Sequence, residues 1–387
     1  MFDKYGFKKI DFRVGEPQTV VVGMSGGVDS SVAAAILKWQ GYNVIGLFMK
    51  NWEETGADGM CTTESDYSDV KRVSEVLNIP YYTVNFSRQY MDNVFKIFLD
   101  GLGRGYTPNP DILCNREIKF GPFLDFAKKL GADYIATGHY VRVVRDGSNA
   151  CLLKGIDDNK DQSYFLCGLS QEQISKALFP VGDLDKTQVR EIAERLNLIT
   201  AKKKDSTGIC FIGERKFRDF MKNYLGNKNG EIRTLSECIV GSHEGLMYYT
   251  LGQRKGLKIG GVKGEDEARW FVVKKDLEKN VLYVNNGECD EMFTKELIAI
   301  DFNWIGGVPL ELKEKNIDKA KFECMAKTRY RQPDQRCWVE ILDNKDSKKD
   351  FSKIKVVFDK KQRAVTPGQW VVLYNGDVCL GGGVISV

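Results

Sequence analysis

Short apolar runs alternate with amphipathic stretches over the first 140 residues of the chain. The apolar runs have the length of β-strands and cover residues 20–24, 44–49, 81–86 and 134–137. The stretches between them place apolar residues at the spacing of a helix face, over 32–37, 65–77, 91–102 and 118–130. Such alternation is typical of a parallel sheet covered by helices on both faces. The pattern therefore predicts an α/β domain in the first half of the chain.

The second half of the chain has a different pattern. Helical spacing returns at 186–196 and 216–224, and the sequence from Gly230 onward is rich in glycine and polar residues. Beyond Leu297, short apolar runs separated by turn residues indicate an antiparallel barrel or sandwich, of which we favour the barrel. We therefore divide the chain into four parts: an N-terminal extension (1–17), an α/β domain (18–215), a small central domain (216–288) and a C-terminal antiparallel β-barrel (289–387).

Composition agrees with a globular protein of two or three domains. The chain has 387 residues, of which 42% are hydrophobic and 28% charged. No apolar run approaches the roughly 18 residues of a membrane span, and the first residues lack the apolar stretch of a secretory signal. We therefore expect a cytoplasmic protein with no membrane partner. The net charge of +4 permits a nucleic-acid partner without demanding one.

Cysteine and histidine limit the available chemistry. The ten cysteines include no Cys-x-x-Cys pair, which argues against a zinc finger and against a dense disulfide framework. With only two histidines, His139 and His243, chemistry that needs several histidines is excluded. We predict no dedicated metal site in the protein.

A loop rich in glycine and serine follows the first apolar run directly. Glycine lets the backbone turn tightly and approach a ligand, and the helix that follows directs its positive end at the same place. The loop lacks the lysine of a Walker A motif, and it resembles instead the PP-loop of ATP pyrophosphatases, which cut ATP between the α and β phosphates. The predicted ATP-binding residues of the loop are Gly23, Met24, Ser25, Gly26, Gly27, Val28, Asp29 and Ser30.

Two cysteines lie in unusual surroundings. Cys114 follows a proline-containing loop, and we expect a helix to begin near Asn115, so that Cys114 lies at a helix N-terminus beside Arg116. Both features favour the thiolate, although a buried structural cysteine is the alternative. Cys210 follows three lysines at 202–204, whose charge favours a thiolate or attracts phosphate. The alternative there is a solvated lysine-rich surface beside a buried cysteine.

Eight segments of the chain together resemble the tRNA-specific 2-thiouridylase family. They are 23–30, 46–52, 107–120, 136–140, 160–165, 202–215, 251–257 and 366–369, and the likeness runs from about Val20 to Ile385. The resemblance implies a PP-loop, adenine nucleotide alpha hydrolase-like fold for the α/β domain. It also implies a tRNA-uridine 2-sulfurtransferase that replaces the C2 oxygen of wobble uridine 34 with sulfur in the tRNAs for Lys, Glu and Gln.

The family's reaction implies roles for both cysteines. The C2 oxygen of the uridine attacks the α-phosphate of ATP, and a persulfide then delivers sulfur to the activated carbon. Carried over, Cys210 would hold a persulfide received from a sulfur-donor protein, and Cys114 would be the nucleophile that releases the sulfur. The two would end as a disulfide that a reductant reopens. ATP is the implied co-substrate, with Mg²⁺ on its phosphates and Asp29 as a contact.

The resemblance also assigns binding residues outside the loop. Met49 and Gly138 would complete the ATP site, although Met49 without the family would be interpreted as a core residue. The target base, turned out of its stack, would meet Asn109, Pro110 and Asp111. The implied tRNA contacts are His139, Lys160, Asp161, Gln162, Arg329, Tyr330 and Gln369, of which Arg329 without the family would be interpreted as part of a solvated strand face.

Three alternatives remain open from the sequence. An iron–sulfur cluster held by Cys114, Cys210 and Asp111 is less favoured, because clusters are usually held by several cysteines. A PP-loop ligase that adenylates a small carboxylate or amide would leave both cysteines and the C-terminal domain without a role. A non-catalytic RNA-binding protein would leave the ATP loop without a role.

Overall fold

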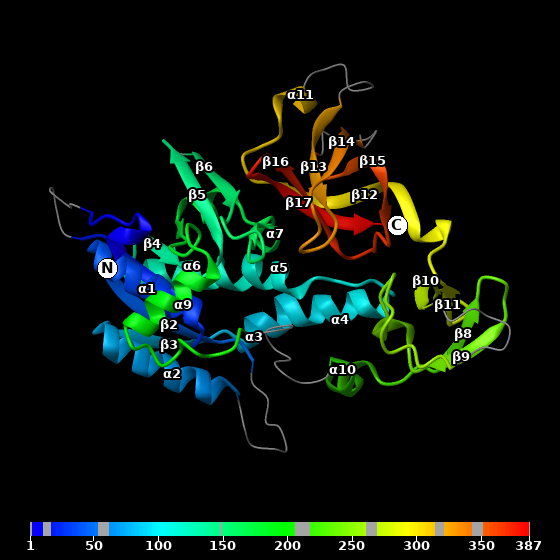
Figure 1. Ribbon diagram of the computed structural model, residues 1–387, viewed down its shortest axis with the longest axis horizontal. Helices are drawn as coiled ribbons and strands as arrows, with labels where there is room; N and C mark the ends of the chain where they lie inside the picture. Colours follow the sequence, from blue (N-terminus) through cyan, green and yellow to red (C-terminus); the bar gives the residue numbers. More distant parts are fainter. Residues whose placement is uncertain are drawn as a thin grey trace.

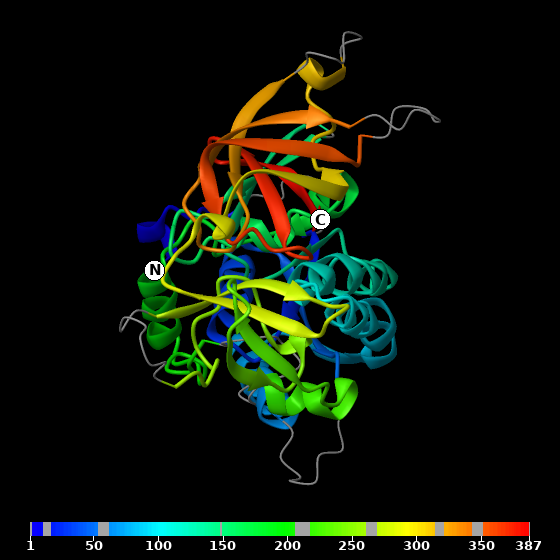
Figure 2. The same ribbon diagram turned by 90° about the vertical axis from the view of Figure 1, so that its right-hand side faces the viewer.

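The structure is a computed structural model with three parts (Figure 1). It describes residues 2–10, 17–52, 62–147, 149–205, 217–260, 269–313, 321–342 and 351–386. An α/β domain occupies the first half of the chain, a small sheet follows, and a barrel of strands forms the C-terminal part. The second view shows the barrel, orange to red, stacked on the α/β domain (Figure 2).

A parallel sheet forms the centre of the α/β domain. Its strands lie in the order β3-β2-β1-β4-β7 and all neighbours run parallel. Their bounds are β1 Thr19–Met24, β2 Asn43–Lys50, β3 Tyr81–Asn85, β4 Tyr134–Ala136 and β7 Ala177–Leu178. Because β1 is central and helices cover both faces, its side chains from Val20 onward are buried, which explains the continuous apolar run. The predicted α/β fold is confirmed.

The helices divide between the two faces of this sheet. One face packs against α1 (Val28–Gln40), α2 (Thr62–Leu77) and α9 (Lys186–Arg195). The other face carries two long helices and α6 (Pro122–Lys129). Each long helix contains a π-type turn: the first comprises α3 Ser87–Tyr90, η2 Met91–Phe95 and α4 Lys96–Gly103, and the second α5 Pro110–Cys114 and η3 Asn115–Lys119. Two short helices follow, α7 Ser163–Leu166 and α8 Gln171–Ser175.

The C-terminal strands close into the predicted barrel. They pair antiparallel in the order β12-β15-β14-β13-β16-β17, and pairing between β12 and β17 completes the ring. Alternate side chains point into its apolar interior, as in Cys337, Val339 and Ile354. The bounds are β12 Phe293–Trp304, β13 Phe322–Lys327, β14 Gln335–Ile341, β15 Ile354–Arg363, β16 Trp370–Asn375 and β17 Val378–Ser386, with α11 at Leu310–Lys313.

A hairpin from the α/β half of the chain joins this barrel, which the sequence pattern did not predict. Strands β5 (Val141–Asp146) and β6 (Asn149–Lys154) pair with each other, and β6 extends the barrel sheet by pairing Leu153 with Val378 of β17. The ammonium of Lys154 also contacts Asp334 at 2.5 Å, between strands of the barrel. The hairpin therefore links the two parts of the fold.

The central part is a small sheet with strands in the order β10-β11-β8-β9. Its strands β8 and β11 run parallel and the other neighbours antiparallel. It contacts the α/β domain near the end of α4, where the Lys275 ammonium donates to the carbonyl of Gly105 at 2.9 Å. The bounds are α10 Phe217–Leu225, β8 Gly230–Thr234, β9 Ile239–His243, η4 Leu246–Tyr248, β10 Trp270–Asp276, β11 Val281–Asn286 and η5 Asp290–Met292.

The described part of the N-terminal extension packs on the α/β domain. Phe2, in a short 3-10 helix (η1, Phe2–Tyr5), is 4% exposed and its ring lies 5.2 Å from that of Trp39 on α1. Tyr5 and Lys4 both donate to the carboxylate of Glu191 on α9. Among the described helices, none combines the length and the hydropathy that crossing a bilayer requires.

Candidate functional site

The glycine-rich loop lies where β1 ends and α1 begins, at the carboxyl end of the parallel sheet. Gly26 has a φ of +74°, and a Cβ there would lie 2.7 Å from the carbonyl oxygen of Asp66, so only glycine fits. Gly27 is the N-cap of α1 and has no side chain to cap the first turn. The hydroxyls of Ser30 and Ser31 donate to the Gly27 carbonyl. The first-turn amides of α1 thus remain available to an anionic ligand.

Two residues predicted to complete the ATP site contact this loop. The Met49 methyl lies 3.2 Å from the position that a Cβ on Gly23 would take. Gly138 packs directly on the first turn of α1, where its Cβ would lie 2.6 Å from the Ser30 amide nitrogen. The glycine is therefore required by the loop itself, whereas the sequence suggested that it admits a ligand. The structure brings Met49, Gly138 and the loop together.

Asp29 is the charged residue of the loop, and two distant side chains hold it. The Tyr140 hydroxyl donates to Asp29 Oδ1 at 2.7 Å. The Lys186 ammonium, at the start of α9, donates to both carboxylate oxygens, at 2.7 and 2.9 Å. Burial first, and then the negative charge of Asp29, raise the pKa of Tyr140 well above its usual range, so the hydroxyl keeps its proton. A Mg²⁺ ion fits this carboxylate, since Mg²⁺ commonly takes one or two protein carboxylates and phosphate oxygens.

A second carboxylate, Asp205, binds the other side of Lys186. The Lys186 ammonium lies 2.8 Å from Asp205 Oδ1, Lys160 lies 2.6 Å from Oδ2, and Arg190 donates to Oδ1 at 2.9 Å. Burial alone would raise the pKa of Asp205, but hydrogen bonds from Lys160 and Lys186 lower it to about 2. Sequence reasoning missed Lys186, Arg190 and Asp205, because nothing in local spacing connects them to the loop. Tyr140 could have been found, since it directly follows Gly138 and His139.

The helix that carries Cys114 begins earlier than the sequence suggested. Asn109 is its N-cap, and its side-chain oxygen accepts from the amides of Asp111 and Ile112 at 3.1 and 3.3 Å. The helix starts at Pro110 and continues through Cys114 into the π-type turn at Asn115–Lys119. The prediction that Cys114 lies at a helix N-terminus is therefore wrong, because the Asn109 cap and Pro110 start the helix one turn earlier. Cys114 is buried, at 1% exposure.

The loop that precedes this helix is held by the C-terminal barrel. Thr107 donates its amide to the Pro367 carbonyl at 2.9 Å, and its own carbonyl accepts from Gln369 Nε2 at 2.6 Å. Gly368 packs so closely that a Cβ there would lie 2.8 Å from the Tyr106 side chain. Gln369, predicted to contact tRNA, therefore fixes the loop next to the predicted base-contacting residues Asn109, Pro110 and Asp111.

Several other predicted tRNA contacts are engaged within the protein. His139 is 8% exposed, and its Nδ1 lies 2.7 Å from the Thr137 hydroxyl. Burial first, and then the charge of Lys119, hold the pKa of His139 well below its usual range, so the ring is neutral. Asp161 is buried and accepts from the Ser163 amide and hydroxyl. The Gln162 side chain accepts from the Tyr140 amide at 3.0 Å.

Arg329 and Tyr330, two of the predicted contacts in the barrel, differ in their surroundings. Arg329 is partly buried, and its Nη2 donates to the carbonyls of Leu251 and Ala364 at 2.9 and 2.7 Å. It therefore joins the central domain to the barrel, which corrects the interpretation of a solvated strand face. Tyr330 stacks at a tilt against Phe165, with 4.4 Å between the ring centres. Contacts of all these residues with tRNA stay predictions.

Cys210 lies outside the described residues, so its place relative to Cys114 stays a prediction. Within the described ranges, no three Cys, His, Asp or Glu side chains gather closely enough to hold a metal ion. The preference for the two-cysteine route over an iron–sulfur cluster likewise stays a prediction.

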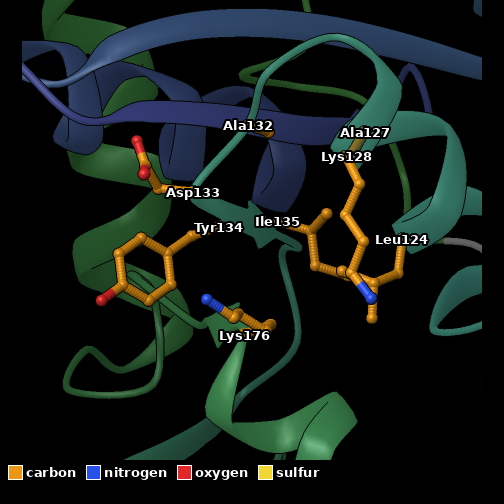
Figure 3. A pocket seen from close by; sticks show the side chains of 8 residues that line it. All are labelled: Leu124, Ala127, Lys128, Ala132, Asp133, Tyr134, Ile135 and Lys176. Atoms are coloured by element: carbon orange, nitrogen blue, oxygen red, sulfur yellow. The ribbon is translucent and has the colours of Figure 1, made fainter.

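A cavity of about 100 Å³ lies at the opposite end of the same sheet (Figure 3). It opens at the amino ends of β4 and β7, where the Lys176 ammonium lies 5.8 Å from the Tyr134 ring centre. The residues that line it are Leu124, Ala127, Lys128, Ala132, Asp133, Tyr134, Ile135 and Lys176. Because the glycine loop follows the carboxyl end of β1, this cavity is separate from the candidate nucleotide site.

The fold and the loop together define a class. A parallel sheet with a serine- and glycine-rich loop at the carboxyl end of its central strand, and no Walker lysine, is the arrangement of PP-loop nucleotide-binding proteins, here with two β-domains attached. Three family descriptions match in succession along the chain. They are "tRNA methyl transferase HUP domain" over residues 18–214, "tRNA methyl transferase PRC-barrel domain" over 218–286 and "Aminomethyltransferase beta-barrel domain" over 294–385.

Curated relatives identify the family. A tRNA-specific 2-thiouridylase of Geobacillus kaustophilus is 56% identical over 368 residues, covering 95% of this chain and 95% of that protein. One of Exiguobacterium sibiricum is 54% identical over 372 residues, covering 96% of this chain and 94% of that protein. The chain therefore belongs to the tRNA-specific 2-thiouridylase family, which confirms the predicted family and enzyme class.

A solved structure with some likeness is a U34-tRNA thiolase from Methanococcus maripaludis with its [4Fe-4S] cluster. It is 18% identical, covers 57% of this chain and 72% of that chain, and superposes with a TM-score of 0.34.

Proposed function

We propose that this protein is a tRNA 2-thiouridine synthase that acts on wobble uridine 34 of the tRNAs for Lys, Glu and Gln. The segment after β4 carries the proposal, because it contacts both the glycine loop and the helix that contains Cys114. Gly138 packs on the glycine loop, and the His139 ring lies 6.2 Å from that of Phe120, where the Cys114 helix ends. A nucleotide on the loop and a base near the Cys114 helix would therefore be neighbours.

The first step would activate the base. ATP would bind along the first turn of α1, with Met49 and Gly138 beside the loop and Asp29 as the carboxylate for Mg²⁺. Mg²⁺ would supply charge neutralisation on the phosphates. The uridine C2 oxygen would attack the α-phosphorus and expel pyrophosphate, which converts a poor leaving oxygen into AMP. Asn109, Pro110 and Asp111 would hold the base, because Asn109 caps the helix and thereby fixes all three residues.

The second step would exchange oxygen for sulfur. Cys210 would carry a persulfide, loaded by a sulfur-donor protein. The Cys114 thiolate would attack the Cys210 sulfur, so that a disulfide forms and the electrons of the broken S–S bond stay on the terminal sulfur. That sulfide would add to C2 and AMP would leave. A reductant would then reopen the Cys114–Cys210 disulfide.

The tRNA itself would lie across the α/β domain and the barrel. Lys160, Tyr330 and Gln369 would line its path, and His139, Asp161, Gln162 and Arg329 would shape the surface through the internal contacts described above. We also propose 18–215, 216–288 and 289–387 as the domain limits, with the α/β domain binding ATP. Cytoplasmic localisation follows as part of the same proposal, since tRNA is the substrate.

Reconstitution with unmodified tRNA tests the proposal. The purified chain is incubated with ATP, Mg²⁺, a persulfide donor and tRNA, and nucleosides are analysed by mass spectrometry. We expect 2-thiouridine at position 34, with AMP and pyrophosphate in equal amounts. Cys210→Ala should abolish thiolation and keep ATP binding, whereas Cys151→Ala, at an exposed cysteine on β6, should keep both.

Two outcomes would contradict this assignment. The first is AMP formation on a small carboxylate without any 2-thiouridine, which would indicate a PP-loop ligase. The second is a Cys210→Ala variant that no longer binds ATP, because the sulfur-carrying residue should not hold the nucleotide.

A further inference from the structure

The glycine loop carries no positive side chain of its own. Residues 23–31 contain neither lysine nor arginine, and the charged side chain among them is the carboxylate of Asp29. A triphosphate brings several negative charges to this place, and Asp29 would repel them. Backbone amides and the helix dipole contribute only partial charges. Any positive side chain that helps Mg²⁺ hold the phosphates here must therefore come from elsewhere in the fold.

Lys186 is a positive side chain that tertiary structure brings to the loop. It lies 157 positions from Asp29 in the chain, yet its ammonium binds both oxygens of that carboxylate. Its side chain is 14% exposed, so it is held in a defined position rather than extended into solvent. The first residue of α9 carries it, and the capping box formed by Asp185 and Gln188 fixes that end of the helix.

Neighbouring cations are bound at other places. Lys203 pairs with Asp66 and Asp69 of α2. Arg190 donates through Nη1 to the carbonyls of Ala201 and Lys203, and through Nη2 to Asp205. Lys186 is the member of this group whose ammonium contacts the loop.

We propose that Lys186 is the phosphate-binding cation of the glycine loop and that Asp205 positions it. This inference rests on the proposed ATP-dependent function. An ammonium has three donors, and here they are shared between Asp29 and Asp205. When a nucleotide binds with Mg²⁺, Lys186 exchanges an oxygen of Asp29 for an oxygen of the β- or γ-phosphate and keeps its bond to Asp205. Asp29 is then available to Mg²⁺.

The predicted consequence is a loss of affinity that depends on phosphate number. A hydrogen bond to a charged group contributes about 1.5–3 kcal/mol, which corresponds to roughly 10- to 150-fold in Kd. Lys186→Met should weaken MgATP binding by about that factor and leave adenosine binding within about twofold. Lys186→Arg should recover part of the loss, since it keeps the charge. Asp205→Asn should give a smaller loss than Lys186→Met, because the ammonium stays in place but loses the negative charge of its second partner.

Isothermal titration calorimetry of the full chain with ATP, AMP and adenosine measures these affinities. Lys176→Met is the matched control, because this exposed lysine lies at the opposite end of the same sheet (Figure 3). It should bind all three ligands like the wild type. Thermal unfolding checks that each variant is folded. If Lys186→Met does not fold, the ratio of ATP affinity to adenosine affinity is compared with the wild type in Lys186→Arg and Asp205→Asn instead.

The outcomes separate this inference from the proposed function. Wild-type protein that fails to bind ATP would refute the proposed function. Wild-type binding with an unchanged ATP affinity in Lys186→Met, or with equal losses for ATP and adenosine, would refute the role of Lys186 alone. An Asp205→Asn variant with wild-type ATP affinity would remove the positioning role of Asp205.

Discussion

Replacing Gly138 with alanine tests whether the segment after β4 sets the position of the glycine loop. The new Cβ would lie 2.6 Å from the Ser30 amide nitrogen and 2.7 Å from the Asp29 carbonyl carbon. Both are backbone atoms, so no side chain can rotate away. Because the protein interior is close-packed, the overlap cannot be absorbed by empty space. The first turn of α1 must therefore move by several tenths of an ångström, up to roughly 0.8 Å.

The expected magnitude follows from this overlap. Overpacking of a dense interior costs about 1–3 kcal/mol. We expect Gly138→Ala to lower the free energy of unfolding by about that amount, measured by urea denaturation. Because the moved amides are those that would bind phosphate, MgATP affinity should also fall, by roughly 5- to 150-fold if the same free energy is lost from binding.

Gly103→Ala is the matched control for this substitution. A Cβ at Gly103, in the last turn of α4, would meet nothing within 4 Å, and alanine favours a helix over glycine. This variant should keep wild-type stability or exceed it slightly, with unchanged ATP affinity. Wild-type stability and ATP affinity in Gly138→Ala would refute the inferred packing of this segment on the loop.

Two further predictions concern His139 and Arg329. Because His139 is neutral in the fold and protonates when unfolded, the free energy of unfolding should fall as pH drops below about 6.5, by up to about 1.4 kcal/mol per pH unit. His139→Gln should reduce this pH dependence in urea titrations from pH 7.5 to 5.5. An unchanged pH dependence in the variant would contradict the burial of His139 as a neutral ring. Arg329→Met should lower the free energy of unfolding by about 2–3 kcal/mol, since it leaves the carbonyls of Leu251 and Ala364 without this donor. The control is Arg331→Met, at an exposed neighbouring arginine, which should change the free energy of unfolding by less than about 0.5 kcal/mol. Equal effects of the two substitutions would argue against the interdomain role of Arg329.

The helix of Cys114 shows where local sequence was misleading. Apolar spacing indicates a helix over residues 118–130, which predicts a helix start next to Cys114. The Asn109 side chain and Pro110 are themselves start signals, and they begin the helix one turn earlier. Periodicity requires several apolar positions, whereas a single cap decides where a helix begins.

Sequence patterns also could not predict which strands distant in the sequence pair with each other. The hairpin of β5 and β6 lies between segments of the α/β domain in the chain, yet it joins the barrel through Leu153 and Val378. Strand propensity marks a segment as a strand but does not name its partner, because any strand edge offers the same backbone donors and acceptors.

The sequence by itself determined the parallel α/β domain, the barrel and the glycine loop. Apolar runs report burial on both faces of a sheet, and the loop's glycines report backbone positions that other residues cannot adopt. Tertiary structure alone decided what surrounds Asp29. Lys186, Tyr140 and Asp205 are brought there by α9 and by the segments that follow β4 and α9, and an ion pair between residues 157 positions apart leaves no trace in local spacing. Charge is satisfied by whichever side chains the fold places together, so the electrostatics of this site could be known only from the folded chain.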